Sequence, residues 1–303
     1  MAQAFPSRPL KMIVPFPPGG PTDIAARLVA IKMSEELGQP VVVDNRAGAT
    51  GMLGSGVVSS APPDGYLFVM GTMGSHVQAP LMAGNAPYNA RTGFTPISLL
   101  ATAPLVLMVN PPLKADTVSE LVALMKASPG KFTYSSSGIG SPLHLAGAML
   151  EYMTGARGLH VPYKGSAPAL QAVMAGEVDF LFDVVSSAQP FVTSGRTRGL
   201  AVTGVKRVGS MSTLPTMMEA GFPKFEAYTW NALFAPPGTS ADIVARLNKA
   251  SVNAVKDPLV AARMVELGLE PVGSTSAELA ALLSADIAKW GLVIAASGLK
   301  GSN

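Results

Sequence analysis

The feature that most constrains the fold is a repeated alternation of short apolar runs, loops rich in glycine and proline, and amphipathic stretches. Residues 10–14 (Leu-Lys-Met-Ile-Val) form a compact apolar run that ends at Pro15. Ile24, Leu28 and Ile31 then recur at helical spacing. This order of elements predicts a strand, a loop and a helix.

The same pattern returns directly afterwards. A buried strand is predicted at 41–43, a short helix at 51–60 and a strand at 66–70, and Thr22 or Asp23 is expected to cap the first helix. Strands joined by a crossover helix usually pair in parallel, so the sequence predicts an α/β fold with a largely parallel sheet.

The rest of the chain predicts a second lobe and a return to the first. Strands are expected at 94–99, 105–109, 131–135, 159–161, 178–182, 200–202 and 228–234, and helices at 118–127, 142–153, 167–175 and 186–194. Helix starts of the capping-box type occur at Thr239-x-x-Asp242 and Thr275-x-x-Glu278. We therefore predict one lobe from 1–105 plus 227–303, a second lobe from 106–226, and a ligand cleft between them.

Composition excludes several classes of protein. With 48% hydrophobic and 14% charged residues and a net charge of +3, the 303-residue chain is too apolar for disorder and too poor in basic residues to coat a nucleic acid. It has no cysteine, and its three histidines are far apart in sequence, so we expect no metal site. The longest strongly apolar stretch, 99–109, is about half a membrane span, so no spanning segment is expected.

The segment between the first strand and first helix is the first candidate binding loop. Its glycines let a ligand approach the backbone, its prolines hold the loop rigid, and the N–H groups of the next helix point above the sheet. A rigid turn without a ligand is the alternative. The residues expected to bind ligand here are Phe16, Gly19, Gly20, Pro21, Thr22 and Asp23.

Three further loops rich in glycine and hydroxyl groups follow predicted strands and should gather at the same edge of a sheet. Their candidate ligand-binding residues are Thr72, Ser75, His76, Ser137, Gly138, Ser141, Tyr163, Lys164, Gly165 and Ser166. Caps and turns are the alternative role for the hydroxyls, and a solvated side chain the alternative for Lys164. Of the histidines, His76 is expected to face the cleft and His144 to serve the core or a cap.

Asp183 ends the predicted strand at 178–182 and has two open roles. It either caps the following helix, which begins near Ser186 and Ser187, or faces the ligand. Against a dianionic ligand a carboxylate would be repulsive, whereas against an ammonium group it would form a charge-assisted hydrogen bond.

Enzyme motifs are missing from the sequence. No serine lies in a G-x-S-x-G elbow, and Gly130-Lys131 lacks a preceding P-loop. Gly138-Ile139-Gly140 is followed by Leu143 where a dinucleotide fingerprint requires its last glycine. We therefore expect neither a cofactor nor catalytic residues. The sequence Ala2-Gln3-Ala4 has the small-x-small form of a signal-peptidase site, which favours a chain whose signal has been removed.

Five motifs in order carry a resemblance to a known family. They are Pro15-Phe16-Pro17-Pro18-Gly19-Gly20-Pro21-Thr22-Asp23, Val43-Asp44-Asn45-Arg46-Ala47-Gly48-Ala49-Thr50-Gly51, Pro63-Asp64-Gly65-Tyr66, His160-Val161-Pro162-Tyr163-Lys164-Gly165 and Phe234-Ala235-Pro236-Pro237-Gly238-Thr239. From about residue 8 to 297 the sequence resembles the Bug family of extracytoplasmic solute receptors, the binding components of tripartite tricarboxylate transporters.

The resemblance implies a two-lobed type II periplasmic-binding-protein fold, export by a cleaved signal to the periplasm, and capture of a small carboxylate between the lobes. The family often holds a carboxylate through backbone amides and ordered water, which maps onto 16–22, with polar groups from the loops around Ser75, Ser137 and Gly165. Dicarboxylates, aromatic acids and acidic amino acids all stay open as ligands. We expect a monomer that delivers its ligand to a pair of membrane permease subunits. The alternative is an enzyme or ligand sensor on a similar bilobal fold, which turnover of a candidate ligand would reveal.

Overall fold

The computed structural model describes residues 5–301, so the sequence Ala2-Gln3-Ala4 lies outside the described residues. Within them, the chain divides into two compact units: unit 1 comprises 5–102, 230–292 and 300–301, and unit 2 comprises 103–229 and 293–299. The sequence-based division placed all of 227–303 in the first lobe. The structure instead groups 293–299, the end of the last helix and the turn after it, with unit 2.

Unit 1 is built on three parallel strands. They are β1 (Leu10–Val14), β2 (Val41–Asn45) and β3 (Leu67–Thr72), in the order β2–β1–β3. β9 (Tyr228–Ala235) pairs antiparallel with β3, and β10 (Glu270–Pro271) pairs antiparallel with β4 (Thr95–Val109). Because the three parallel strands run the same way, the segments that follow them meet at one edge of the sheet.

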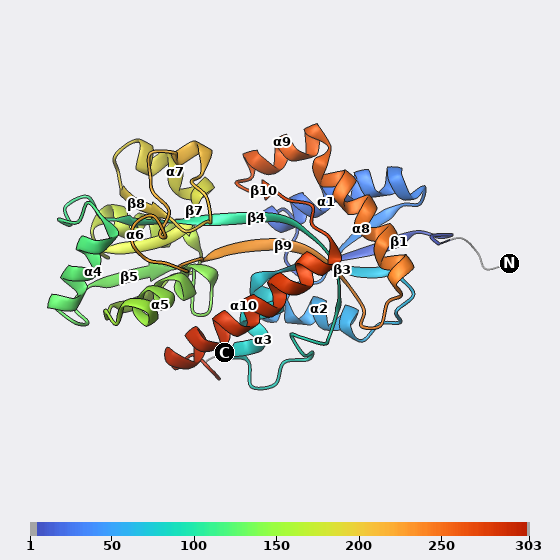
Figure 1. Cartoon of the computed structure of the whole chain (residues 1–303), viewed down its shortest axis with the longest axis horizontal. Coiled ribbons are helices and arrows are strands. Elements are labelled where there is room, and N and C mark those ends of the chain that lie inside the picture. The colour runs from blue at the N-terminus through green and yellow to red at the C-terminus, as the bar shows by residue number, and fades with distance from the viewer. Residues whose placement is uncertain (1–4, 302–303) are drawn as a thin grey trace. The chain divides into compact units, whose positions relative to one another are not determined.

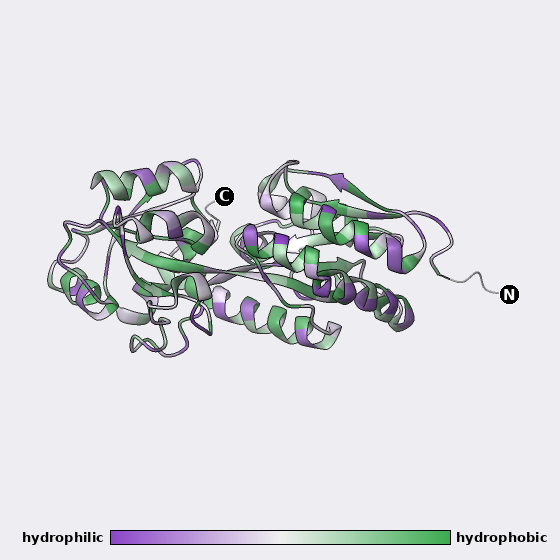
Figure 2. Ribbon diagram, turned by 90° about the horizontal axis from the view of Figure 1, so that it is seen from above, coloured by the Kyte–Doolittle hydropathy of each residue, from purple (hydrophilic) through white to green (hydrophobic). Residues whose placement is uncertain are grey.

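Helices cover both faces of this sheet. They are α1 (Pro21–Leu37), α2 (Met52–Ser59), α3 (Ala79–Met82), α8 (Ala241–Lys256), α9 (Pro258–Glu266) and most of α10 (Ser276–Ala296), with single turns at Ala49–Gly51 and Gly74–Gln78. Figure 1 shows α1 and α2 on opposite faces. This follows from right-handed crossovers that run in opposite directions along the sheet, from β1 to β2 through α1 and from β2 past β1 to β3 through α2. In Figure 2 the strands are mostly hydrophobic, whereas the helices alternate hydrophobic and hydrophilic residues.

The last helix, α10, is the one described helix that is long and apolar enough to cross a membrane by length and composition. Five of its buried residues recur at spacings of three and four, namely Leu279, Leu283, Ile287, Trp290 and Ile294. Residues between them, such as Ala280 and Ser284, are exposed. This spacing is the pattern of a helix packed on a protein core.

Unit 2 is a second α/β layer structure. Its strands are β5 (Thr133–Ser136), β6 (Leu159–Pro162), β7 (Phe180–Val184), β8 (Arg198–Val202) and the second half of β4, in the order β8–β4–β7–β5–β6. Its helices are α4 (Val118–Ala127), α5 (Pro142–Thr154), α6 (Ser166–Ala175) and α7 (Val185–Thr193), with a short turn at Gly209–Met211. β6, β5 and β7 are parallel neighbours, so their carboxyl ends also share one edge.

Two local expectations were wrong, and one helix was not predicted. The strands expected at 94–99 and 105–109 are one strand, β4, in which Pro104 lies between the stretch paired with β10 and the stretch paired with β7. α9 was not predicted; the Asp257 side chain caps it by accepting the N–H groups of Leu259 and Val260. Neither Thr22 nor Asp23 caps α1. Gly20 is its N-cap residue without a side-chain cap, and Pro21 is its first residue.

Candidate functional site

A concavity of about 470 Å³ lies over the loop between β1 and α1. It is lined by Phe16, Pro17, Pro18, Gly19, Gly20, Pro21, Thr22 and Asp23. The N–H groups in the first turn of α1 have no acceptor within the helix, and the helix dipole makes this end partly positive. The loop therefore offers donors and a favourable field to an anion.

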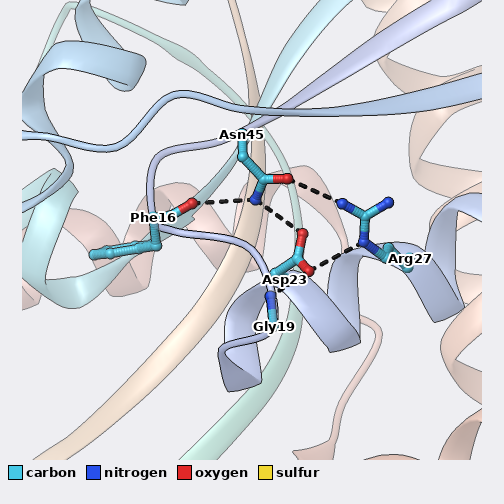
Figure 3. Close-up of polar contacts among 5 residues, drawn as sticks. All are labelled: Phe16, Gly19, Asp23, Arg27 and Asn45. Carbon is cyan, nitrogen blue, oxygen red and sulfur yellow. Dashed lines mark hydrogen bonds and ion pairs between the residues drawn. The ribbon is translucent and has the colours of Figure 1, made fainter.

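The buried side chain of Asp23 stabilises this loop through hydrogen bonds (Figure 3). Its Oδ2 accepts the N–H of Gly19 at 2.9 Å and Nε of Arg27 at 3.0 Å, and its Oδ1 accepts Nδ2 of Asn45 at 2.8 Å. The same Asn45 nitrogen lies 3.1 Å from the carbonyl oxygen of Phe16. Asn45 thereby ties both ends of the loop to the end of β2.

The hydrogen bonds around Asp23 stabilise its negative charge. Burial by itself would raise the pKa of this carboxyl, but hydrogen bonds from Arg27, Gly19 and Asn45 outweigh burial and hold the pKa below its ordinary 3.8. Both oxygens are occupied, and the residue is only 2% exposed. Asp23, which is predicted to bind ligand, lines the concavity, but both of its oxygens accept hydrogen bonds from within the protein that stabilise the loop.

Thr72, Ser75 and His76, which are predicted to bind ligand, are buried in this structure. Ser75 Oγ accepts the N–H of Thr72 at 3.0 Å and lies 3.0 Å from Nδ1 of His76. The His76 ring stacks on Phe234 at 4.3 Å and packs against Phe94 at 4.4 Å, and burial lowers its pKa to about 3. The ring is a neutral part of the core of unit 1.

The loop after β2 supports the β1–α1 loop by close packing. A Cβ atom at Gly51 would lie 2.8 Å from Cβ of Ser75 and 3.2 Å from Cζ of Phe16, so only glycine fits there. Gly51 also has a positive φ of 88°, as have Ala49 and Thr50 before it. The motif that includes Asn45 and Gly51 thus packs against the β1–α1 loop and stabilises its conformation.

In unit 2 the candidate residues do come together. Ser136 lies opposite Pro162 across the parallel pair β5 and β6, and the N–H of Tyr163 donates to the carbonyl oxygen of Ser136 at 3.0 Å. The nearest atom to a Cβ built on Gly138 is the carbonyl oxygen of Tyr163, at 3.6 Å. The loops 136–141 and 163–165 are therefore neighbours at one sheet edge.

The polar groups at this edge differ in what they already bond. Ser141 caps α5 by accepting the N–H of His144 at 3.3 Å. Within residues 5–301 the side chains of Ser137, Tyr163 and Lys164 make no hydrogen bond or ion pair, and Lys164 is exposed. These three side chains are free to meet a ligand.

Asp183 is fully buried at the end of β7. Its Oδ2 accepts a hydrogen bond from the hydroxyl of Ser166, the first residue of α6, and its Oδ1 accepts the N–H of Val184 at 2.8 Å. Burial raises the pKa of Asp183 to about 6 despite both bonds. The capping role is not observed, because Val184 is the N-cap residue of α7 and has no side-chain cap. Asp183 instead links the start of α6 to β7.

Sequence reasoning missed three residues of these networks. Arg27 lies four residues after Asp23 on α1, which is the spacing of a helical ion pair and the signal that could have identified it. Asn45 and His160 had no local signal beyond their motifs, since their partners lie 22 and 24 residues away. In the part of the chain that the structure describes, no group of three or more His, Asp or Glu residues could hold a metal ion.

Comparisons with known proteins agree with this architecture. The sequence model of the tripartite tricarboxylate transporter family receptor matches residues 25–299. A Pseudomonas protein encoded in the tcbD–tcbE intergenic region is 40% identical over 288 residues, covering 95% of this chain and 85% of that protein. Protein BugT of Bordetella pertussis is 36% identical over 304 residues, covering 99% and 92%.

Solved structures show the same relationship. The periplasmic binding protein BugD is 34% identical with a TM-score of 0.76, covering 98% of this chain and 99% of BugD. A Rhodopseudomonas palustris protein solved with adipate is 36% identical with a TM-score of 0.78, covering 97% and 98%. MatC from the same species, with bound malate, is 32% identical with a TM-score of 0.76, covering 96% and 100%.

The periplasmic-binding-protein fold expected from the sequence is thereby confirmed. The matched family is a family of receptors, and BugD is described as a periplasmic binding protein. Since the family match spans most of the sequence and both relatives align over nearly all of it, this chain belongs to the tripartite tricarboxylate transporter receptor family.

Proposed function

We propose that the protein is a periplasmic receptor that captures a small carboxylate, with aliphatic diacids as the first class to test. The observation that carries this proposal is the concavity over the β1–α1 loop, where the start of α1 meets open space. Asp23, the one acidic residue among those lining the concavity, has both oxygens turned to internal donors. An anion there meets backbone donors and no free carboxylate.

The similar structures support the ligand class. One neighbour was solved with adipate and another with malate, both of which are small dicarboxylates. In this chain we assign the carboxylate contact to Phe16, Gly19, Gly20, Pro21 and Thr22, with ordered water completing the hydrogen bonds. From unit 2 we assign ligand contact to Ser137, Gly138, Ser141, Tyr163, Lys164, Gly165 and Ser166.

The cellular role follows from the family. We propose that the receptor works as a monomer, delivers its ligand to membrane permease subunits and performs no chemistry on it. The family name and the BugD neighbour support the transport role. Incubation of the protein with a bound carboxylate, followed by NMR of the released ligand, tests the absence of turnover: recovery of altered ligand would favour an enzyme.

Thermal unfolding with a panel of ligands tests the binding proposal. Adipate, malate, glutamate and benzoate are compared with their amides. A carboxylate present at one hundred times its Kd adds about 2.7 kcal/mol to the free energy of unfolding, which is visible as a rise in Tm. The proposal fails if no carboxylate raises Tm, or if the amides do so equally well.

A further inference from the structure

The loop between β5 and α5 is held in an unusual conformation that depends on a few hydrogen bonds. Gly138 has a φ of 130° and Gly140 a φ of 73°, both in the region that favours glycine. Ser136 Oγ accepts the N–H of Gly138 at 3.1 Å, and the N–H of Ser141 donates to the carbonyl oxygen of Gly138 at 3.2 Å. Because the loop lacks regular secondary structure, its shape depends on what lies behind it.

His144 is the first group behind the loop. Its Nδ1 accepts the N–H of Gly140 at 3.0 Å, so Nδ1 carries no proton and the neutral ring is protonated on Nε2. Gly140 is buried, as is His144. Without His144 the N–H of Gly140 would lose its acceptor away from water, which is a costly arrangement for a backbone amide.

His160 is the second group. Its Nε2 lies 2.7 Å from Oγ of Ser136, the same oxygen that accepts the N–H of Gly138. His160 comes from β6, whereas His144 comes from the first turn of α5. The loop is therefore fixed at Gly138 through one imidazole and at Gly140 through the other.

The two rings are stacked on each other. Their centroids are 3.7 Å apart with an interplanar angle of 9°, and the Tyr134 ring lies 5.0 Å from His160 and 6.3 Å from His144. A movement of either ring displaces the other, so the two anchors of the loop act together. Close approach of α5 to Tyr134 at Gly147, where a Cβ would lie 2.4 Å from the Tyr134 ring, keeps the stack in place.

The stack is uncharged at neutral pH. Burial lowers the pKa of His144 to about 3, with the neighbouring His160 adding to the effect, and burial lowers the pKa of His160 to about 4. The other titratable group whose ring faces the pair is Tyr134, whose pKa is raised by burial and by Glu151 of α5. Within the described residues, no acidic side chain forms an ion pair with either histidine.

We propose that His144 and His160 are paired positioning residues that hold the Gly138–Ser141 loop in its ligand-receiving conformation. The inference rests on the proposed function, because that proposal assigns ligand contact to this loop. The rings act through hydrogen bonds to Gly140 and Ser136 and do not themselves contact the ligand.

The first test compares His144→Leu with His144→Asn. Leucine keeps an apolar side chain of similar bulk and removes the acceptor for the Gly140 N–H, whereas asparagine places an oxygen near the position of Nδ1. Hydrogen–deuterium exchange of peptides covering 137–141, measured without ligand, should be about tenfold faster or more in His144→Leu and close to the wild type in His144→Asn. The Kd for adipate should follow the same order.

The second test repeats the comparison at the other ring with His160→Leu and His160→Gln, since the glutamine amide reaches the position of Nε2. Circular dichroism and Tm confirm that each variant is folded. Equal exchange in the leucine variants and the wild type overturns the inference, as does faster exchange in the amide variants than in the leucine variants. If wild-type protein binds no carboxylate, the proposed function fails, but the exchange rates of the unliganded loop still decide whether the histidines position it.

Discussion

The amide nitrogen of Asn45 lies 2.8 Å from Oδ1 of Asp23, although the two residues are 22 positions apart in the chain. Asn45 ends β2 and Asp23 lies in the first turn of α1, so this bond joins α1 to the end of the strand that pairs with β1. A residue that the sequence suggests as a ligand contact thereby stabilises the loop to which we assign the carboxylate.

Replacing Asp23 by asparagine should destabilise unit 1. The carboxylate accepts bonds at both oxygens, whereas an asparagine side chain has one acceptor and must point an NH₂ group at a donor. We expect a loss of about 1 to 3 kcal/mol in the free energy of unfolding at pH 7, measured by urea denaturation. Because the pKa of Asp23 is lowered, its contribution persists above pH 3.8 and disappears as the pH falls below that value.

Asp116→Asn is the matched control for this prediction. Asp116 pairs with Arg198 at the surface, and its side chain is 79% exposed. The control should change the free energy of unfolding by less than about 0.5 kcal/mol. Equal effects of the two substitutions would show that the bonds of Asp23 contribute nothing particular to the loop.

Gly20→Val should abolish binding while leaving the fold intact. Gly20 has a negative φ of −78°, and the nearest atom to a Cβ built there is the carbonyl oxygen of Pro17 at 3.8 Å, so the backbone accepts a side chain. The added side chain enters the concavity where the ligand approaches the backbone. We expect at least a tenfold rise in the Kd for the carboxylate, measured by calorimetry, and a loss of stability of about 1 kcal/mol at most.

The control for Gly20→Val is Gly84→Val. A Cβ at Gly84 also meets open space, and its φ is not positive, but the residue lies outside the concavity. Binding should be unchanged in this variant. Normal carboxylate binding by Gly20→Val would mean that the first loop is a rigid turn without a role in recognition.

Asp183→Asn should remove a contribution that makes the folded protein more stable at low pH. The folded-state pKa of Asp183 is raised from 3.8 to about 6, so the folded protein binds this proton more readily than the unfolded chain does. Protonation therefore favours folding between these values, and the ionised group lowers the stability above pH 6 by about 3 kcal/mol at most. Urea denaturation should show that the wild type loses less stability between pH 8 and pH 5 than Asp183→Asn does, because protonation of Asp183 partly offsets the proton uptake of the histidines on unfolding.

The same variant separates two classes of ligand. If the ligand is a dicarboxylate, Asp183→Asn should leave its Kd unchanged or lower it, because the substitution removes a negative charge from the end of β7. If the ligand is a zwitterion whose ammonium group meets Asp183, the affinity should fall by about 2 to 4 kcal/mol. An equal loss for an amino acid and its deaminated analogue would restrict Asp183 to a role in the fold.

Unfolding should take up protons below neutral pH because burial lowers the pKa of every histidine in the chain. His76 and His144 have a pKa of about 3 and His160 of about 4 in the folded protein, against 6.5 in the unfolded chain. The unfolded state binds more protons in that window, so stability falls as the pH drops below 6.5. Asp183 instead releases a proton on unfolding, so the net uptake on unfolding at pH 5.5 should be about two protons.

The pH dependence of the unfolding free energy measures this uptake. Its slope near pH 5.5 corresponds to about 1.4 kcal/mol per pH unit for each proton taken up. Asp183→Asn should increase the slope by about one proton, since the opposing group is removed. A flat profile between pH 5 and 7 would contradict the neutral, buried state of the three rings.

The order of elements could be read from the sequence because it depends on neighbours within a few residues. The apolar run 10–14 became β1, the predicted helix 118–127 is α4, and Thr275 with Glu278 forms the expected capping box at the start of α10. The sequence also predicted that loops cluster at one sheet edge within each unit, because parallel strands place their carboxyl ends at the same edge whatever their side chains are.

The roles of single polar residues were decided by the tertiary structure. The residues next to Asp23 in sequence do not indicate that its side chain bonds to Asn45. Those next to His76 do not indicate that its ring packs on Phe94 and Phe234. The same holds for the stack of His144 on His160, in which the two rings come from α5 and β6. Local propensity determines which segments become strands and helices, whereas the direction in which a polar side chain points depends on donors and acceptors that only long-range packing brings within 3 Å.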